Sequence, residues 1–166
     1  MIIKIKKKLV LFIINNFLKG TKFFKIKNKM MKWCGFDIGV NTNIVGPLYI
    51  SLSIDLKIGD NCWIGRGFTI DGNGSVNIMN NVDIAPEVLI STGSHYIGSN
   101  NKRAGIGKTL STKIEDGCWI GTRAMLIEGC NVSKGSIVSA GSIVKDNYDE
   151  NSLISIEFAV CKKRLI

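Results

Sequence analysis

His95 is the only histidine in this chain of 166 residues, and it is the first candidate for chemistry. A lone histidine is ordinarily structural, so its type alone decides nothing. Its position favours a catalytic interpretation, because a regular aliphatic pattern ends just before residues 91–95 (STGSH) and a polar segment follows. A neutral imidazole on a rigid frame can remove a proton from a hydroxyl or an amine, which contributes about 10²–10⁴ in rate.

The five cysteines do not form a metal-binding pattern. The sequence contains no CxxC pair and no Cys-His cluster, so it predicts no metal site. An odd number of cysteines without a secretory signal is typical of a reducing compartment. We therefore expect a cytoplasmic protein.

A six-residue repeat of branched aliphatic residues must position His95. It is broken once, and its twelve positions are Ile58, Ile64, Ile70, Val76, Val82, Val88, Ile114, Ile120, Leu126, Val132, Val138 and Val144. Ile38, Ile44 and Ile50 already have this spacing upstream. A period of six fits neither an amphipathic helix nor an alternating sheet, but the short faces of a parallel β-helix require it. The sequence thus predicts an all-β domain of stacked coils.

Small residues mostly stand two positions before these aliphatic residues: Cys62, Gly74, Cys118, Ala124, Cys130, Ser136 and Ser142. Residues two apart in a strand share a face, so these side chains should point into the narrow interior. Cys62, Cys118 and Cys130 are therefore predicted to be buried, reduced thiols.

The repeat fails between Leu89 and Lys113, and the spacing from Val88 to Ile114 is not a multiple of six. A segment must therefore leave the stack. We expect an extruded loop at about residues 94–112, and loops of this length are usually functional or disordered. His95 would lie where the coil ends and the loop begins.

Residues 1–32 contain ten lysines and no acidic residue, whereas the rest of the chain is close to neutral. Basicity confined to one end argues against nucleic-acid binding, which usually uses a basic face beside stacking aromatics. The apolar run Leu9–Ile14 is too short to cross a bilayer and has no small-residue cleavage site. We expect one or two helices packed on the end of the β-helix.

Two alternatives for this segment remain open. Residues 1–20 could form a basic helix that makes peripheral contact with anionic lipid at the inner membrane face. The segment could also be a disordered arm.

Three blocks of sequence carry a resemblance to a known family. They are NVDIAPEV at residues 81–88 with TGSH at 92–95, IEDGCWIG at 114–121, and VSAGSIV at 138–144. With them the chain resembles the hexapeptide-repeat acyltransferases over about residues 38–155. The resemblance is to sugar O-acetyltransferases of the maltose, galactoside and nodulation-factor type and their relatives in surface-polysaccharide biosynthesis.

This resemblance implies a left-handed parallel β-helix, which we place at residues 33–155, between the basic helical segment at 1–32 and a basic tail or short helix at 156–166. It also implies a homotrimer with active sites between subunits. Acetyl-CoA would be the co-substrate, a carbohydrate the acceptor, and no metal would be needed.

The same resemblance assigns roles to particular residues. His95 corresponds to the general base, and Asp71 to an acidic residue close to the acceptor sugar. Thr122 corresponds to a residue near the thioester and pantetheine, and Ala140 to one that lines the pantetheine channel.

Other residues are expected to meet the cofactor without a matching family position. Trp119 and Gly121 lie in the same region, and Trp119 could equally pack an interface. Lys162 and Lys163 of the basic tail could meet the phosphates of CoA. A backbone N–H near Gly121 and Thr122 would stabilise the oxyanion, a contribution of about 3–4 kcal/mol.

The implied reaction is direct acetyl transfer to a sugar hydroxyl, without a covalent acyl-enzyme. An amino-sugar N-acetyltransferase remains an alternative, because His95 could deprotonate an amine as well as a hydroxyl. A non-catalytic β-helix that serves as a binding or scaffold subunit is the alternative from another class.

Overall fold

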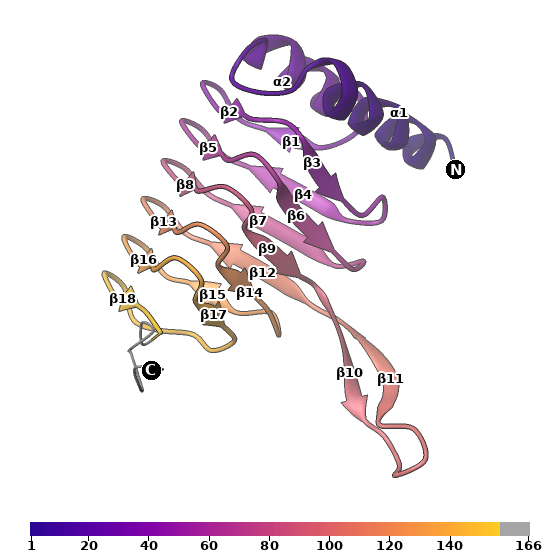
Figure 1. The fold of residues 1–166 in the computed structure, drawn as a ribbon, viewed down its shortest axis with the longest axis vertical. Helices are drawn as coiled ribbons and strands as arrows, with labels where there is room; N and C mark the ends of the chain where they lie inside the picture. The colour runs from indigo at the N-terminus through magenta and orange to yellow at the C-terminus, as the bar shows by residue number, and fades with distance from the viewer. Residues whose placement is uncertain (157–166) are drawn as a thin grey trace, which may run out of the picture.

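The computed structural model describes residues 1–156, so most of the predicted tail at 156–166 lies outside the described residues. The chain forms a parallel β-helix with two helices at its N-terminal end and a long hairpin that projects from one edge (Figure 1). The helices are α1 (Ile2–Phe17) and α2 (Phe24–Trp33).

Three parallel sheets form the sides of the stack. The first face contains β1 (Asp37–Ile38), β4 (Asp55–Ile58), β7 (Ser75–Ile78), β12 (Ser111–Ile114) and β15 (Asn131–Val132). The second face contains β2 (Asn43–Ile44), β5 (Trp63–Ile64), β8 (Asp83–Ile84), β13 (Trp119–Ile120), β16 (Ile137–Val138) and β18 (Leu153–Ile154). The third face contains β3 (Leu48–Ile50), β6 (Phe68–Asp71), β9 (Leu89–Ser91), β14 (Met125–Leu126) and β17 (Ile143–Val144).

The interior of the stack is filled by the aliphatic residues of the repeat. All twelve predicted positions are buried, as are Ile38, Ile44 and Ile50. Buried and exposed residues alternate along each short strand, since successive side chains point to opposite faces of a strand. The prediction of a stacked, aliphatic core is confirmed.

The predicted register was wrong for Val76, Val82 and Val88. Ile58, Ile64 and Ile70 pair with Ile78, Ile84 and Ile90, each twenty residues further on. The three valines are also buried, each two residues before one of those isoleucines. The cause is the corner between the third and first faces, where each early coil has two more residues than a hexad allows. In the later coils Ile114 pairs with Val132, which restores the hexad spacing.

The N-terminal helices lie across the first coil (Figure 1), as the sequence predicted. α1 buries Val10, Leu11 and Ile14 against the stack. Lys7 and Lys27 are buried as well, and burial lowers the pKa of both amines. Lys7 Nζ donates to the carbonyl oxygen of Ile54 at 2.7 Å, and Lys27 Nζ donates to that of Gly20 at 2.8 Å.

Asn15 occupies the free edge of the third face. Its Nδ2 donates to the carbonyl oxygen of Leu48 at 2.6 Å, and its Oδ1 accepts from the Leu48 N–H at 2.8 Å. One amide side chain therefore satisfies both backbone groups of Leu48, which a further strand would otherwise have paired.

The segment after β9 leaves the stack as predicted, but it is a hairpin rather than an irregular loop. β10 (Gly93–Ile97) and β11 (Ala104–Thr109) pair antiparallel, with His95 opposite Gly107. In Figure 1 the hairpin projects well beyond the coils. This second sheet sets the position of His95.

Candidate active site

The ring of His95 is exposed at the base of the hairpin. Its Nδ1 lies 2.9 Å from the carbonyl oxygen of Gly105 on the opposite strand. A carbonyl oxygen can only accept a hydrogen bond, so Nδ1 carries the hydrogen. In the neutral ring Nε2 then has the lone pair, and it is the atom that can accept a proton.

His95 and Asp71 line the same cleft, whose volume is about 460 Å³. The side chains around them are polar: Asn73, Ser91, Ser94, Lys108 and Thr109. Asp71 ends β6, directly beside Ser91 at the end of β9, and the chain then continues into β10. The topology therefore brings together two residues that are far apart in sequence and that the sequence had singled out.

Thr92 holds the connection between Asp71 and the hairpin. This buried residue donates from its N–H and its Oγ1 to the backbone carbonyl of Asp71, at 2.9 and 3.1 Å. A Cβ on Gly72 would lie 2.5 Å from Thr92 Oγ1, and Gly72 has a φ of 107°, which only glycine adopts readily. The turn after Asp71 is thus fixed by one glycine and one threonine.

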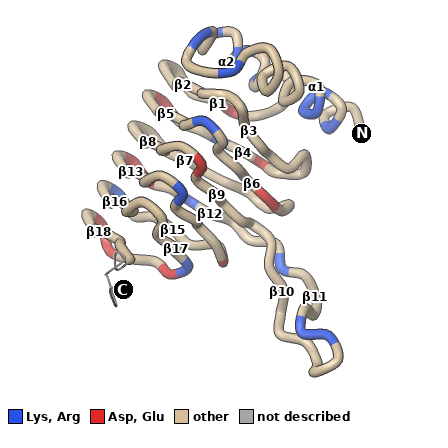
Figure 2. Tube along the Cα trace, viewed as in Figure 1, with Lys and Arg blue, Asp and Glu red and all other residues tan. Residues whose placement is uncertain are grey.

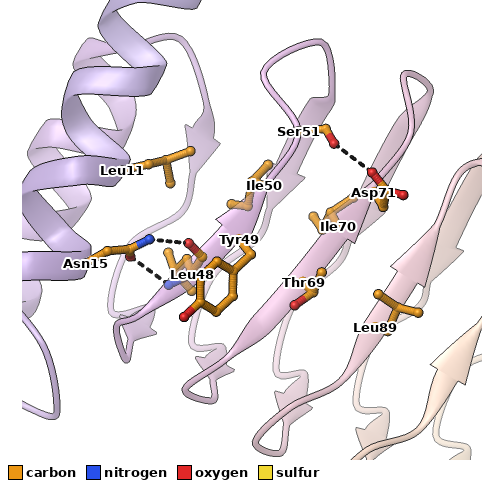
Figure 3. Close-up of a pocket in the computed structure, with 10 residues that line it drawn as sticks. All are labelled: Leu11, Asn15, Leu48, Tyr49, Ile50, Ser51, Thr69, Ile70, Asp71 and Leu89. Carbon is orange, nitrogen blue, oxygen red and sulfur yellow. Dashed lines mark hydrogen bonds between the residues drawn. The ribbon is translucent and has the colours of Figure 1, made fainter.

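A second cleft of about 490 Å³ lies between α1 and the third face (Figure 3). Leu11 and Asn15 come from the helix, and Tyr49 and Thr69 come from the sheet. Asp71 lines this cleft too, and its Oδ1 accepts a hydrogen bond from Ser51 Oγ at 3.0 Å. The two clefts therefore meet at Asp71.

The hairpin is tied to the coils on either side of it by side chains that sequence reasoning missed. Ser94 Oγ donates to Glu128 Oε1 at 2.6 Å, and Lys108 Nζ lies 3.8 Å from Glu128 Oε2. Thr109 Oγ1 donates to Asn73 Oδ1 at 3.1 Å. No motif links these pairs in the sequence, because their members are 20 to 36 residues apart.

The residues assigned to the cofactor lie at another corner of the stack. Gly121 and Thr122 follow β13, and the Gly141 N–H of the next coil donates to the Thr122 carbonyl at 2.9 Å. A Cβ on Gly121 would lie 2.5 Å from the Ala140 nitrogen, so Gly121, Thr122 and Ala140 are close neighbours. Trp119 is exposed on the adjacent second face.

Within one chain, the residues assigned to the cofactor do not lie beside His95. Trp119, Gly121, Thr122 and Ala140 are not among the described residues that line the cleft of His95. They flank the corner between the second and third faces, whereas the hairpin leaves the corner between the third and first faces. Lys162 and Lys163 lie outside the described residues.

The structure narrows the choice of backbone donor near Gly121 and Thr122. The Gly121 N–H donates to the Val138 carbonyl at 2.7 Å within the parallel ladder, so it is not available to an oxyanion. Thr122, the next residue, remains the candidate for that backbone donor.

Known proteins with a similar sequence include acetyltransferases, although no family model matches the chain. A Saccharomyces cerevisiae protein provisionally named an acetyltransferase, YJL218W, is 34% identical over 111 residues, which are 67% of this chain and 57% of that protein. The galactoside O-acetyltransferase of Escherichia coli K12 is 29% identical over 114 residues, which are 69% of this chain and 56% of the enzyme. The chain belongs to the hexapeptide-repeat acyltransferases. It spans little more than half the length of these relatives.

Solved structures of this family share the fold. The hexapeptide-repeat acetyltransferase VCA0836 of Vibrio cholerae, in complex with acetyl-CoA, superposes with a TM-score of 0.72 at 18% identity, over 92% of this chain and 81% of that one. A galactoside acetyltransferase in complex with CoA gives a TM-score of 0.65 at 20% identity, over 90% and 74% of the two chains. The protein therefore has the left-handed β-helix fold that the resemblance led us to expect.

The cysteines of this hexapeptide-repeat chain are not suited to nucleophilic chemistry. Cys34, Cys62, Cys118 and Cys130 are all buried and free, which confirms the prediction for the three within the repeat. Burial raises the pKa of each thiol, that of Cys130 to about 11. Cys161 lies outside the described residues.

Proposed function

We propose that this protein is an acetyltransferase that moves the acetyl group of acetyl-CoA to a sugar hydroxyl of a surface-polysaccharide precursor. The observation that carries the proposal is the imidazole of His95, whose Nδ1–H is held by the Gly105 carbonyl beside the cleft of Asp71. A histidine held in this tautomer presents Nε2 as a base. The related galactoside O-acetyltransferase and the neighbour solved with acetyl-CoA support the choice of acceptor and donor.

His95 would act as general base and then as general acid. Nε2 accepts the proton of the acceptor hydroxyl while the oxygen attacks the thioester carbonyl, and the Gly105 carbonyl stabilises the imidazolium that forms. The C–S bond then breaks, the acetyl ester remains on the sugar, and the CoA thiolate takes the proton from Nε2. No protein nucleophile takes part, in agreement with the buried, protonated thiols.

Asp71 would orient the acceptor. Its carboxylate lies where the two clefts meet, so a sugar in the cleft beside α1 would reach His95 past this residue. Carboxylates accept strong hydrogen bonds from sugar hydroxyls, and the ring of Tyr49 in the same cleft offers an apolar surface to a sugar face. Acceptor binding is therefore assigned to the cleft of Figure 3.

Acetyl-CoA would bind along the other corner of the stack. Trp119, Thr122 and Ala140 would line the thioester and pantetheine, with the Thr122 N–H as oxyanion donor. Lys162 and Lys163 would meet the phosphates of CoA. We assign the reaction to the cytoplasm, which the free thiols of the described residues support.

A homotrimer would complete the site. His95 and the cofactor residues lie at different corners of one chain, so the corner of one copy has to meet a different corner of the next. Such head-to-tail contacts close into a ring, and they need two different surfaces on each subunit. The second and third faces offer exposed apolar residues, Trp63, Trp119, Ile137, Tyr49, Met125 and Ile143. The first face instead presents Asp37, Lys57, Asn77 and Lys113 outward.

Release of the CoA thiol tests the proposal. We expect the protein to release thiol from acetyl-CoA only when a sugar acceptor is present, and His95→Ala to lower kcat by about 10²–10⁴. Ile97→Ala, which changes an exposed residue of the same strand, serves as the matched control. Full activity in His95→Ala would remove the base assignment, and absence of turnover on every acceptor would favour a scaffold protein.

The product distinguishes hydroxyl from amine acceptors. An ester is cleaved by mild base, whereas an amide survives the same treatment. N-acylation is the second candidate, because Nε2 can take a proton from an amine equally well and because the N-acyltransferase AntD of Bacillus cereus shares the fold with a TM-score of 0.60 at 18% identity. An intact-mass measurement of the product before and after base treatment decides between them.

A further inference from the structure

Helix α1 is apolar on two opposite faces. Val10, Leu11 and Ile14 face the stack and are buried. Ile2, Ile5, Leu9 and Phe12 follow one another at intervals of three and four residues on the opposite side, where they are 69, 61, 49 and 56% exposed. This spacing places them on one stripe, which we term the outer stripe. Within residues 1–156 no other element covers it.

Lysines flank the outer stripe, and residues 1–32 contain no acidic residue to balance them. Lys4 and Lys8 are exposed on α1, and Figure 2 shows basic residues over both helices. α2 adds Lys25, Lys29 and Lys32, which line a cleft with the exposed side chains of Phe23 and Ile26. The N-terminal end of the stack is therefore both apolar and strongly cationic.

We propose that α1 binds the surface of an anionic lipid bilayer, with the outer stripe inserted among the headgroups and the lysines against lipid phosphates. A helix with an apolar stripe and a lysine-rich flank suits this interface, where apolar insertion and charge attraction add together. The helix lies in the plane of the surface. Among residues 1–156 no helix combines the length and apolar character needed to cross a bilayer.

Charge selects the bilayer over a second copy of the chain. Two outer stripes packed face to face would bring their lysines together without any acid of residues 1–32 between them. An anionic bilayer supplies the missing negative charge and an apolar layer at once. The occupant of the stripe is thus a lipid surface.

Membrane docking would also bring the second cleft, the one between α1 and the third face, close to the bilayer. Leu11 and Asn15 lie on α1 and line that cleft, which continues to Asp71. Sugars attached to the bilayer would then be presented to the cleft. This consequence rests on the proposed function, whereas lipid binding itself does not.

Flotation of the full-length protein with vesicles tests the proposal. The vesicles contain either phosphatidylcholine alone or phosphatidylcholine with about one third phosphatidylglycerol, in about 0.1 M salt. We expect binding to the anionic vesicles only, and weaker binding in about 1 M salt because salt screens the lysines. Failure to bind anionic vesicles, or equal binding to both kinds, would overturn the proposal.

Matched variants separate the stripe from its charges. Ile5→Gln combined with Phe12→Gln should weaken binding by about tenfold or more, because two apolar side chains no longer insert. Ile97→Gln, which changes an even more exposed apolar residue of the hairpin, should leave binding unchanged. Lys4→Ala with Lys8→Ala should weaken it by about 25-fold, while Lys134→Ala with Lys145→Ala at the far end of the stack should not.

Two further measurements keep the result decisive. Thermal unfolding should be unchanged in all variants, since every substituted side chain is exposed, and turnover on a water-soluble acceptor should persist in the stripe variant. Undiminished vesicle binding by that variant would contradict the proposal. So would loss of self-association in sedimentation without loss of vesicle binding, which would identify the stripe as an interface between copies.

Discussion

The interior of the stack and the hairpin that carries His95 are held in place by different forces. In the interior, side chains such as Ile84 and Leu126 are fully buried and stack from coil to coil. Along β10 and β11 every residue is exposed or half-buried, and polar contacts tie the hairpin to the stack: the hydrogen bonds of Ser94 and Thr109 and the ion pair of Lys108 with Glu128. Apolar burial therefore stabilises the fold, while a few polar contacts position the imidazole of His95.

This difference implies that stability and activity can be altered separately. Apolar burial contributes about 25 cal/mol for each Å² removed from water, and the hairpin buries little. Exposed hydrogen bonds contribute about 1 kcal/mol or less each, yet they fix the geometry of the base. Substitutions in the two regions should have opposite signatures.

The largest effect is expected when two inactive variants assemble into the same trimer. His95→Ala removes the base, and Ala140→Trp should block the cofactor corner at an exposed position. Each variant alone should be nearly inactive. Co-expressed, they should regain about a quarter of wild-type activity, because random trimers then contain sites in which both corners are intact. Turnover of the co-purified mixture measures this.

As a control, the two variants are purified separately and then mixed. This mixture should stay inactive, because trimers that are already assembled should not exchange subunits. Absence of recovery after co-expression would mean that base and cofactor belong to one chain.

In the interior, Ile64 is only 1% exposed. Ile64→Ala should lower the free energy of unfolding by about 2–5 kcal/mol, because the smaller side chain leaves a cavity in the core. Turnover per folded molecule should be retained. Urea denaturation measures the stability, and Ile97→Ala, on the hairpin, should change it by no more than about 0.5 kcal/mol. Equal losses at the two positions would erase the contrast between stack and hairpin.

Alkaline pH should weaken the interior through its thiols. The folded protein keeps Cys130 protonated because burial raises its pKa to about 11, while the unfolded chain loses that proton near the ordinary value of 9.0. Stability from this group is thus complete below about pH 9 and is lost as the pH rises to about 11, by about 2.7 kcal/mol at most.

Comparison with Cys130→Ala isolates this contribution. The buried amines of Lys7 and Lys27 have lowered pKa values and act in the opposite direction, but they are common to both proteins. From about pH 8 to about pH 11 the wild type should lose about 2–3 kcal/mol more than the variant, measured by denaturation at each pH. Parallel curves would show that the Cys130 proton is not linked to folding.

The smallest effect is expected at Glu128. Glu128→Ala removes the partner of Ser94 and Lys108, so kcat should fall by about three- to tenfold as the hairpin loosens, with little change in the KM for acetyl-CoA. Glu128→Gln keeps an acceptor for Ser94 and should recover most of the loss. Steady-state kinetics tests both variants, and identical defects would argue against a positioning role.

The stack could be predicted because its signal is local. One aliphatic residue per face and one small residue beside it are visible within each hexad, so the core and its buried thiols followed from spacing. The register of the early coils did not, because Val76 and Ile78 are both aliphatic and both inward. Two extra corner residues therefore left no trace in the hydrophobic pattern.

The candidate site could be predicted only in part. His95 was visible as a single residue type beside a break in the repeat, and a resemblance pointed to Asp71. The features that orient His95 were not visible, since one is the backbone carbonyl of Gly105 and the other joins Ser94 to Glu128 across coils. Contacts made by backbone atoms, or by side chains far apart in the sequence, produce no recognisable sequence pattern.

The amide of Asn15 at the rim of the first coil has a consequence for how copies behave in a crowded cell. A β-helix that ends bare is a template, because its last strands can recruit the next molecule end to end and grow as a fibre. Here Asn15 occupies both hydrogen-bonding groups of Leu48, and Lys7 occupies the carbonyl of Ile54. Three backbone groups of that rim are therefore already paired within the molecule, which disfavours end-to-end addition of another molecule through them.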